Sequence, residues 1–173
     1  MLFLLPTDTC YGLAWEFSES DFLEIYSLKW RGFDKQLALL VEDYDDMKNY
    51  IEIPDEQREF LKNYPHPWSY LGKRQKDFML PEWMDRESYQ MISLRVARVC
   101  IPPFHLSTFP PFHYPLFLTS ANRSWMSETK TLAEAGEVFP GIAWIDGGIC
   151  DRPPSDIFSL DSRGELVYLR RNY

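Results

Sequence analysis

The run Leu37–Val41 limits what this chain can fold into more than any other feature of the sequence. Its five consecutive residues are all apolar, as is typical of a strand that is buried on both faces. Such a strand lies inside a sheet, and each face of that sheet needs a covering layer. The run therefore predicts a layered fold in which the sheet has cover on both sides.

Strand-like and helix-like segments alternate along the rest of the chain. Short apolar runs predict strands, whereas capping residues followed by helical spacing predict helices. The expected strands are 2–5, 13–17, 37–41, 68–71, 91–97, 116–119, 142–145, 157–160 and 166–170, and the expected helices are 18–29, 45–50, 55–63 and 131–139. Five prolines between Pro102 and Pro115 exclude a regular helix there. Because the last two strands form a hairpin, we expect a mixed α/β sheet flanked by helices.

The first of these helices has an inward face that ends in a cation. Its apolar residues recur at helical spacing, and Lys29 follows on the same face. A positive charge suits the C-terminal end of a helix. We therefore expect the Lys29 side chain to be directed inward at that end.

The composition is that of a compact globular protein. The 173 residues are the length of one domain, and we expect a single domain over residues 1–173. Apolar residues make up 45% of the chain and charged residues 25%, which excludes a fibre, a coiled coil, a membrane span and a disulfide scaffold. The net charge of −8 repels nucleic acid, so a phosphate ligand requires a local cluster of cations.

The cysteines and the first residues favour a cytoplasmic location. Cys10, Cys100 and Cys150 lie far apart and form no C-x-x-C pair, so we expect reduced thiols without a zinc or redox motif. The apolar start of the chain stops at Pro6 and carries no basic charge. We expect a strand there and no signal peptide or membrane anchor.

Four polar segments lie next to predicted strands or helices and could carry chemistry. Each has a common structural explanation when taken alone: a turn, a solvated charge cluster or a capped connection. Hydroxyl and amide side chains can also surround a phosphate, and a basic cluster before a buried strand can line a cleft. In chain order the segments are Pro6–Gly12, Lys29–Arg31 with Lys35, Leu118–Ser124, and Pro153–Ser155 with Arg170 and Arg171.

Taken together and in this order, these segments resemble the YrdC-type threonylcarbamoyl-AMP synthase family. The matching pattern is P-T-D-T-x-Y-G-L, K-x-R, a buried L-x-L-L-V strand, R-V, S-A-N-x-S, D-G-G and P-S before a final L-R-R. The resemblance runs from Leu5 to Arg171 and is weakest between Lys73 and Tyr114. It implies the YrdC/RibB-like fold, in which helices flank a twisted mixed β-sheet with a concave, positively lined cavity.

The resemblance also implies a reaction. Family members condense L-threonine, bicarbonate and ATP into threonylcarbamoyl-AMP and release diphosphate, and a partner transferase then moves the threonylcarbamoyl group onto tRNA. We therefore expect a nucleotidyltransferase that takes ATP with Mg²⁺ as a substrate and has no permanent cofactor. Its expected partners are these small molecules and that transferase, with no membrane association.

The same resemblance assigns binding roles to a set of residues. They are Lys29, Arg31, Arg95, Asn122 and Arg170 for ATP and its phosphates, and Thr7, Ser120 and Ser155 for threonine. No residue is expected to act as a nucleophile, and no dedicated protein cage is expected for Mg²⁺. A metal role is not expected for the three histidines, His66, His105 and His113.

Several residues depart from the family pattern. Trp30 and Trp125 stand where members carry small residues or glycine, so we expect them to narrow the cavity or re-aim its loops. Gln36 departs in the same way, and Asp156 replaces the threonine of P-S-T. We expect the Asp156 carboxylate to lie next to an anionic substrate site, where it is unfavourable without a cation.

Two other interpretations stay open. One is a catalytically altered relative that binds nucleotide or, weakly, double-stranded RNA. Lys73, Arg74 and Lys76 adjoin Trp68 and Tyr70, which could stack on bases, although the net charge of −8 opposes this. The other keeps the chemistry but changes the acceptor, as in relatives that form carbamoyl-adenylate. Those relatives usually carry zinc-binding cysteines, which this chain lacks.

Overall fold

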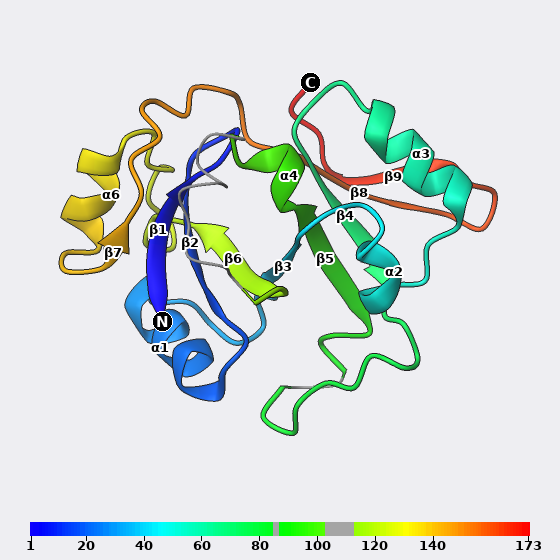
Figure 1. Ribbon diagram of the computed structural model, residues 1–173, viewed down its shortest axis with the longest axis horizontal. Coiled ribbons are helices and arrows are strands. Elements are labelled where there is room, and N and C mark those ends of the chain that lie inside the picture. The colour runs from blue at the N-terminus through cyan, green and yellow to red at the C-terminus, as the bar shows by residue number, and fades with distance from the viewer. Residues whose placement is uncertain (85–86, 103–112) are drawn as a thin grey trace.

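A nine-stranded sheet runs through the protein, with its strands in the order β7-β1-β2-β6-β3-β5-β4-β8-β9 (Figure 1). The computed structural model describes residues 1–84, 87–102 and 113–173. The strands are β1 (Leu2–Pro6), β2 (Tyr11–Glu16), β3 (Ala38–Val41), β4 (Trp68–Lys73), β5 (Met91–Val96), β6 (Leu116–Ser120), β7 (Ala143–Trp144), β8 (Asp156–Leu160) and β9 (Leu166–Arg170). The helices are α1 (Glu19–Lys29), α2 (Met47–Tyr50), α3 (Asp55–Asn63), α4 (Ala97–Cys100) and α6 (Leu132–Val138).

The sheet is mixed, as the sequence predicts. β1 pairs antiparallel with β2 and parallel with β7, and β4 pairs antiparallel with β5 and parallel with β8. The apolar run of residues 37–41 contains β3, which lies in the centre of the sheet. Its parallel neighbour is β5, and its antiparallel neighbour is β6. The last two strands form the expected antiparallel hairpin.

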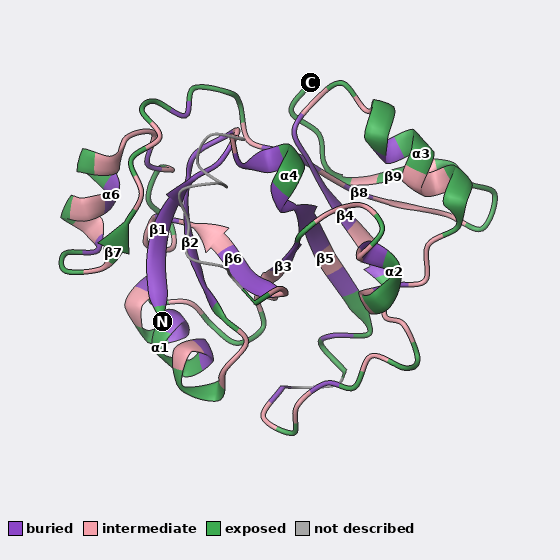
Figure 2. Cartoon of the chain, in the orientation of Figure 1, coloured by how far each residue is buried: buried purple, intermediate pink, exposed green. Residues whose placement is uncertain are grey.

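Alternation of side chains along the strands divides the two faces of the sheet. One face packs against α1, α2, α3 and α6 and holds the larger apolar core, to which Leu39 and Leu94 belong. Leu40 and Leu118 belong to a smaller apolar cluster, which also includes Ala97 and Cys100 of α4. The central strands are buried along most of their length, whereas the outer sides of the helices are exposed (Figure 2). Cover on the second face is therefore partial.

The capping residues explain where two helices begin. The Ser18 side chain accepts a hydrogen bond from the Asp21 backbone N–H at 3.4 Å and caps α1. Thr131 and Glu134 form a capping box at the start of α6. In α1 the inward face ends at Lys29 as predicted, because this side chain is only 2% exposed.

The structure corrects some of the predicted boundaries. The strand expected over 91–97 ends at Val96, because Ala97 begins the one-turn helix α4, which the sequence did not predict. The strand expected over 142–145 pairs at only two residues, Ala143 and Trp144. Most of the segment in which we expect no regular helix, residues 103–112, lies outside the described residues. Of the helices in the described part of the chain, none combines the length and the apolar character needed to cross a bilayer.

Candidate active site

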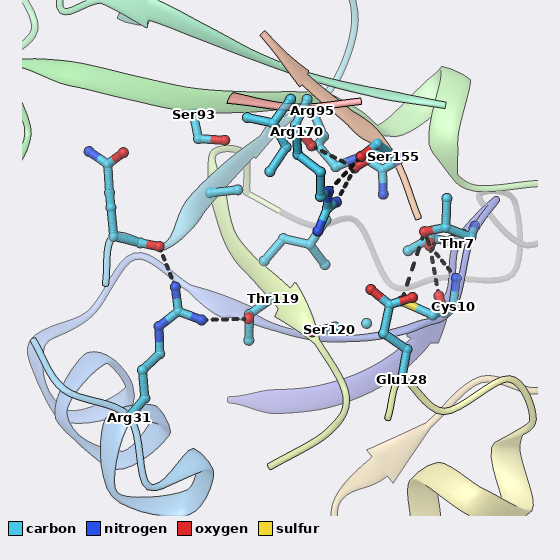
Figure 3. Close-up of a pocket in the computed structure, with 17 residues that line it drawn as sticks. Thr7, Cys10, Arg31, Ser93, Arg95, Thr119, Ser120, Glu128, Ser155 and Arg170 are labelled. Carbon is cyan, nitrogen blue, oxygen red and sulfur yellow. Dashed lines mark hydrogen bonds between the residues drawn. The ribbon is translucent and has the colours of Figure 1, made fainter. Parts of the chain in front are cut away.

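A cavity of about 240 Å³ opens on the partly covered face of the sheet (Figure 3). Its lining comes from both ends of the chain, because the first and last strands both reach this face. The lining residues are Thr7, Thr9, Cys10, Gly12, Arg31, Gln36, Ala38, Ser69, Ser93, Arg95, Leu118, Thr119, Ser120, Glu128, Ser155, Ile157 and Arg170. Of the residues predicted to bind substrates, all but Lys29 and Asn122 line this cavity.

Arg31 enters the cavity from the loop after α1. Its Nε donates to the carbonyl of Lys35 at 3.0 Å, and its Nη2 donates to the carbonyl of Gln36 at 2.6 Å. These bonds fix the guanidinium between the helix end and β3. Burial lowers the pKa of Arg31 from its usual range, although the neighbouring tyrosines and Asp34 oppose this. An anionic ligand at this position would restore the balance of charge.

Arg95 and Arg170 bring two more positive charges to the cavity. The Arg95 Nη2 forms an ion pair with Asp8 at 2.5 Å, and its Nε donates to the carbonyl of Trp68 at 3.2 Å. Arg170 donates to the carbonyl and to the hydroxyl of Ser155, at 2.9 and 3.1 Å. The three guanidinium charges outnumber the carboxylates of Asp8 and Glu128, so the cavity favours an anionic ligand.

Lys29 lies beneath the loop that follows β6. Its Nζ donates to the carbonyl of Asn122 at 2.6 Å and to the carbonyl of Ser120, with the Asn122 Oδ1 at 3.4 Å. Burial and the positive charge of Arg31 lower the pKa of Lys29 to about 7, and the negative charge of Glu128 partly opposes this shift. The contacts of Lys29 with ATP stay a prediction. In the structure this cation holds the loop that carries the S-A-N motif, Ser120–Asn122, which we call the S-A-N loop.

The loop held by Lys29 presents Ser120 to the cavity. The Ser120 hydroxyl donates to the Asn122 Oδ1 at 2.6 Å, and the Asn122 Nδ2 donates to the carbonyl of Met126 at 2.6 Å. Asn122 is therefore engaged within its own loop. Ser120 ends β6, one residue beyond the predicted strand, and the contacts of these two residues with substrate stay a prediction.

Two tryptophans join this loop to the loop after α1. The Arg123 guanidinium lies 4.2 Å from the Trp30 ring, and the Lys35 ammonium lies 4.0 Å from the Trp125 ring. Each loop thus supplies one ring and one cation. We call these four residues the tryptophan clasp. The backbone N–H of Ser124 also donates to the carbonyl of Lys29 at 2.9 Å, beside the clasp.

The clasp corrects one expectation about the cavity. Trp30 and Trp125 are 68% and 92% exposed, and neither ring lines the cavity, so neither narrows it. Both residues have positive φ, 52° and 73°. Positive φ favours glycine, so both tryptophans lie on strained backbone in these two loops. Gln36 does line the cavity, and its Nε2 donates to the carbonyls of Ser88 and Met91 at 3.1 and 2.5 Å.

Thr7 and Cys10 form a turn at the exit of β1. The Thr7 hydroxyl donates to the carbonyl of Cys10 at 2.7 Å and accepts from the Cys10 N–H at 3.3 Å. Gly12 keeps this end of the cavity open, since a Cβ there would lie 2.8 Å from the Leu118 Cδ1 and 3.4 Å from the Thr7 Cγ2. Burial raises the pKa of the Cys10 thiol to about 11, so the thiol is uncharged at neutral pH and is a poor nucleophile.

Asp156 does not lie next to the cavity, contrary to expectation. Its side chain is fully buried on the opposite face of the sheet, where it accepts hydrogen bonds from the Tyr64 hydroxyl and the Asn172 N–H, both at 2.6 Å. Ser155 and Ile157 line the cavity, and the residue between them points away. β8 begins at Asp156, one residue earlier than predicted, so the alternation of the strand directs this carboxylate away from the cavity.

The RNA-stacking surface suggested by the sequence is also wrong. Trp68 and Tyr70 are buried in the larger core, so their rings cannot stack on bases. Lys73 pairs with Glu52 at 2.9 Å, and the Arg74 Nη1 donates to the carbonyl of Phe78 at 3.0 Å. No other aromatic platform beside these cations was predicted.

The described residues offer no group of side chains that could hold a metal ion. Outside residues 85–86 and 103–112, no three His, Cys, Asp or Glu side chains are grouped so that they could hold a metal ion. His66 stacks on the Tyr173 ring at 4.2 Å, and His105 lies outside the described residues.

Sequence reasoning missed Glu128, Ser69 and Ser93. The strand residues could have been found from their alternation with buried neighbours, but Glu128 lies on a loop without periodicity.

Comparisons with known proteins agree with this architecture. The family model Sua5_yciO_yrdC, described as "Telomere recombination", matches residues 1–172. A threonylcarbamoyl-AMP synthase of Mus musculus is 31% identical over 148 residues, which are 83% of this chain and 50% of the relative. One of Escherichia coli O1:K1 / APEC is 29% identical over 161 residues, 88% of this chain and 80% of the relative.

Solved structures share the fold. The crystal structure of P. abyssi Sua5 complexed with L-threonine has a TM-score of 0.78 and 23% sequence identity, and the match covers 98% of this chain and 49% of that one. The chain thus spans about half the length of the mouse relative and of P. abyssi Sua5. The family match spans almost every residue, and the helix-flanked mixed sheet is the same. The chain belongs to the Sua5/YciO/YrdC family.

Proposed function

We propose that this protein is an L-threonylcarbamoyladenylate synthase. The observation that carries the proposal is the cavity in which three arginines, Arg31, Arg95 and Arg170, meet the hydroxyls of Thr7, Ser120 and Ser155. Curated relatives at about 30% identity have the name threonylcarbamoyl-AMP synthase, and P. abyssi Sua5 was crystallised with L-threonine, which supports the same assignment. The substrates are L-threonine, bicarbonate and ATP, which brings Mg²⁺ with it.

The proposed step is attack of a carbamate oxygen on the α-phosphorus of ATP. L-threonine and bicarbonate first give N-carboxythreonine and water. The new oxygen–phosphorus bond then replaces the bond to the β-phosphate, and diphosphate leaves with the electron pair. Negative charge grows on the phosphoryl oxygens and on the leaving group, where fixed guanidinium groups stabilise it. Arg31 and Arg170 are suited to this role because backbone carbonyls already hold both in place.

No protein nucleophile takes part in this proposal. The Cys10 thiol, which lines the cavity, is uncharged at neutral pH because burial raises its pKa to about 11. Catalysis therefore rests on positioning and on electrostatic stabilisation. The product would pass to a transferase that acts on tRNA.

Diphosphate release tests the proposal. The purified protein should form diphosphate only when ATP, Mg²⁺, L-threonine and bicarbonate are all present. Arg31→Ala removes a charged hydrogen-bond donor worth about 1.5–3 kcal/mol, so kcat/KM should fall roughly 10- to 150-fold. Arg31→Lys keeps the charge and should lose less. Circular dichroism would confirm that each variant is folded.

Arg163→Ala is the matched control. This arginine lies in the β8–β9 turn, 73% exposed, and pairs with Asp161 and Glu165 away from the cavity. Its removal should leave diphosphate release unchanged. A folded protein that binds ATP and threonine without releasing diphosphate would overturn the proposal in favour of a catalytically altered relative.

A further inference from the structure

Glu128 is the one acidic side chain among the described residues that line the cavity. It follows the S-A-N loop, outside the motifs that carry the family resemblance. Three guanidinium groups share the same cavity, and all three suit phosphate or carboxylate groups. A carboxylate in such a place requires its own explanation.

The fold itself makes little use of the Glu128 carboxylate. In the described part of the chain its polar contact is an ion pair with the Lys130 Nζ at 3.7 Å, which is longer than a hydrogen bond. Lys130 is already engaged, because its ammonium donates to the carbonyl of Thr9 at 2.6 Å and to that of Arg152 at 3.1 Å. The Glu128 side chain is 25% exposed and remains within reach of a ligand.

Glu128 and Arg31 lie at opposite ends of the cavity. Figure 3 shows Glu128 beside Thr7 and Cys10, whereas Arg31 lies at the other end of the cavity. The negative charge of Glu128 also raises the pKa of Cys10 as a secondary cause after burial, which agrees with this closeness. Glu128 is thus at the end of the cavity where the hydroxyl of Thr7 lies.

In the described part of the chain, the ion pair with Lys130 is long, and two backbone carbonyls share that ammonium. A cation from the ligand would therefore add to the stabilisation of the Glu128 carboxylate. ATP and bicarbonate are anions, but a free amino acid carries a positive α-ammonium group. We propose that Glu128 binds the α-ammonium group of the amino-acid substrate and so makes the cavity select an amino acid over the corresponding hydroxy acid. This inference rests on the proposed function and names the residue that recognises one part of its substrate.

Binding measured without turnover tests this inference. Isothermal titration calorimetry would compare L-threonine with (2S,3R)-2,3-dihydroxybutanoate, in which a hydroxyl replaces the amine. The wild-type protein should bind threonine at least 10-fold more tightly. Glu128→Gln keeps the shape but removes the charge, and its affinity for threonine should fall about 10-fold or more while its affinity for the hydroxy acid is unchanged.

Glu137→Gln provides the control, since it makes the same substitution on the exposed side of α6. It should bind both compounds as the wild type does. Equal threonine affinity in Glu128→Gln and wild type would overturn the inference and leave the proposed function standing. A loss of Mg²⁺-dependent ATP binding with unchanged threonine binding would overturn it in favour of a metal ligand. If the wild type binds no threonine, the proposed function fails as well.

Discussion

The ammonium group of Lys29 is buried where the helix α1 meets the loop after β6. It donates to the carbonyls of Ser120 and Asn122, and Lys29 itself is only 2% exposed. A buried polar group that loses its partner costs about 1–3 kcal/mol. At the scale of the single residue, Lys29 therefore supports both the fold and the presentation of Ser120.

Lys29→Met should lower the free energy of unfolding by about 1–3 kcal/mol for each carbonyl left unpaired. Urea denaturation followed by circular dichroism would measure it. Lys48→Met, on an exposed position of α2, should change stability by less than about 0.5 kcal/mol. Equal unfolding midpoints for the two variants would show that the buried ammonium contributes nothing to stability.

Residue roles were predictable from the sequence only where a regular period fixed the side of the element. Helical spacing correctly directed Lys29 inward. No predicted period covered Asp156, because the predicted strand began at Ile157 whereas β8 begins one residue earlier. Glu128 could not be placed, since a loop side chain has no period and its position depends on the whole fold.

At the scale of elements, the tryptophan clasp sets one loop against another. An exposed cation–π contact contributes about 0.5–1 kcal/mol, whereas a left-handed backbone costs a non-glycine residue about 1–2 kcal/mol. Both the cation–π stabilisation and the backbone cost apply to Trp125, because its φ is 73° and the Lys35 ammonium lies 4.0 Å from its ring. These opposing terms allow the backbone and the ring to be tested separately.

Trp125→Ala should lower the free energy of unfolding by about 0.5–1 kcal/mol, because it loses the ring and keeps the strained backbone. Trp125→Gly loses the ring but relieves the strain, so it should be more stable than the alanine variant. Urea denaturation would rank the two. A double-mutant cycle with Lys35→Met should give a coupling of about 0.5–1 kcal/mol with Trp125→Ala, and a coupling of zero would contradict the clasp.

The sequence located most elements because their apolar patterns are local. The bounds of α3 and β9 agree with the predicted ranges of residues 55–63 and 166–170. The helix α4 was missed because a single turn of four residues is too short to show a helical period. β7 is shorter than its apolar run, since only two of the residues pair with β1.

At the scale of the whole molecule, the cavity joins the two ends of the chain. Thr7 follows β1, and Arg170 ends β9. These two strands lie seven places apart in the order of the sheet. The sequence predicted an α/β sheet from the alternation of elements and its mixed character from the hairpin, but not this strand order. Pairing between strands depends on contacts between distant segments, which a local pattern does not record.

A nucleotide bound in this cavity should stabilise the protein as one unit. A non-hydrolysable ATP analogue with Mg²⁺ at about 100 times its Kd contributes about 2.7 kcal/mol, which should raise Tm by about 5–10 °C. Differential scanning calorimetry would show a single transition that moves as a whole. The shift should be much smaller for Arg31→Ala. Two transitions, of which only one responds, would contradict a cavity shared by both ends.

The alternation of side chains between the two faces of the sheet means that an error in strand register affects both stability and ligand binding. In β5, Leu94 belongs to the core and Arg95 to the cavity, and both are paired with β3. A slip of one residue between these strands would move the charge into the core and the leucine into the ligand space. A molecule with this register slip would therefore lose both its stability and its affinity for the ligand of the cavity. Under the proposed function, chromatography on an immobilised nucleotide should retain the correctly paired molecules and reject the others.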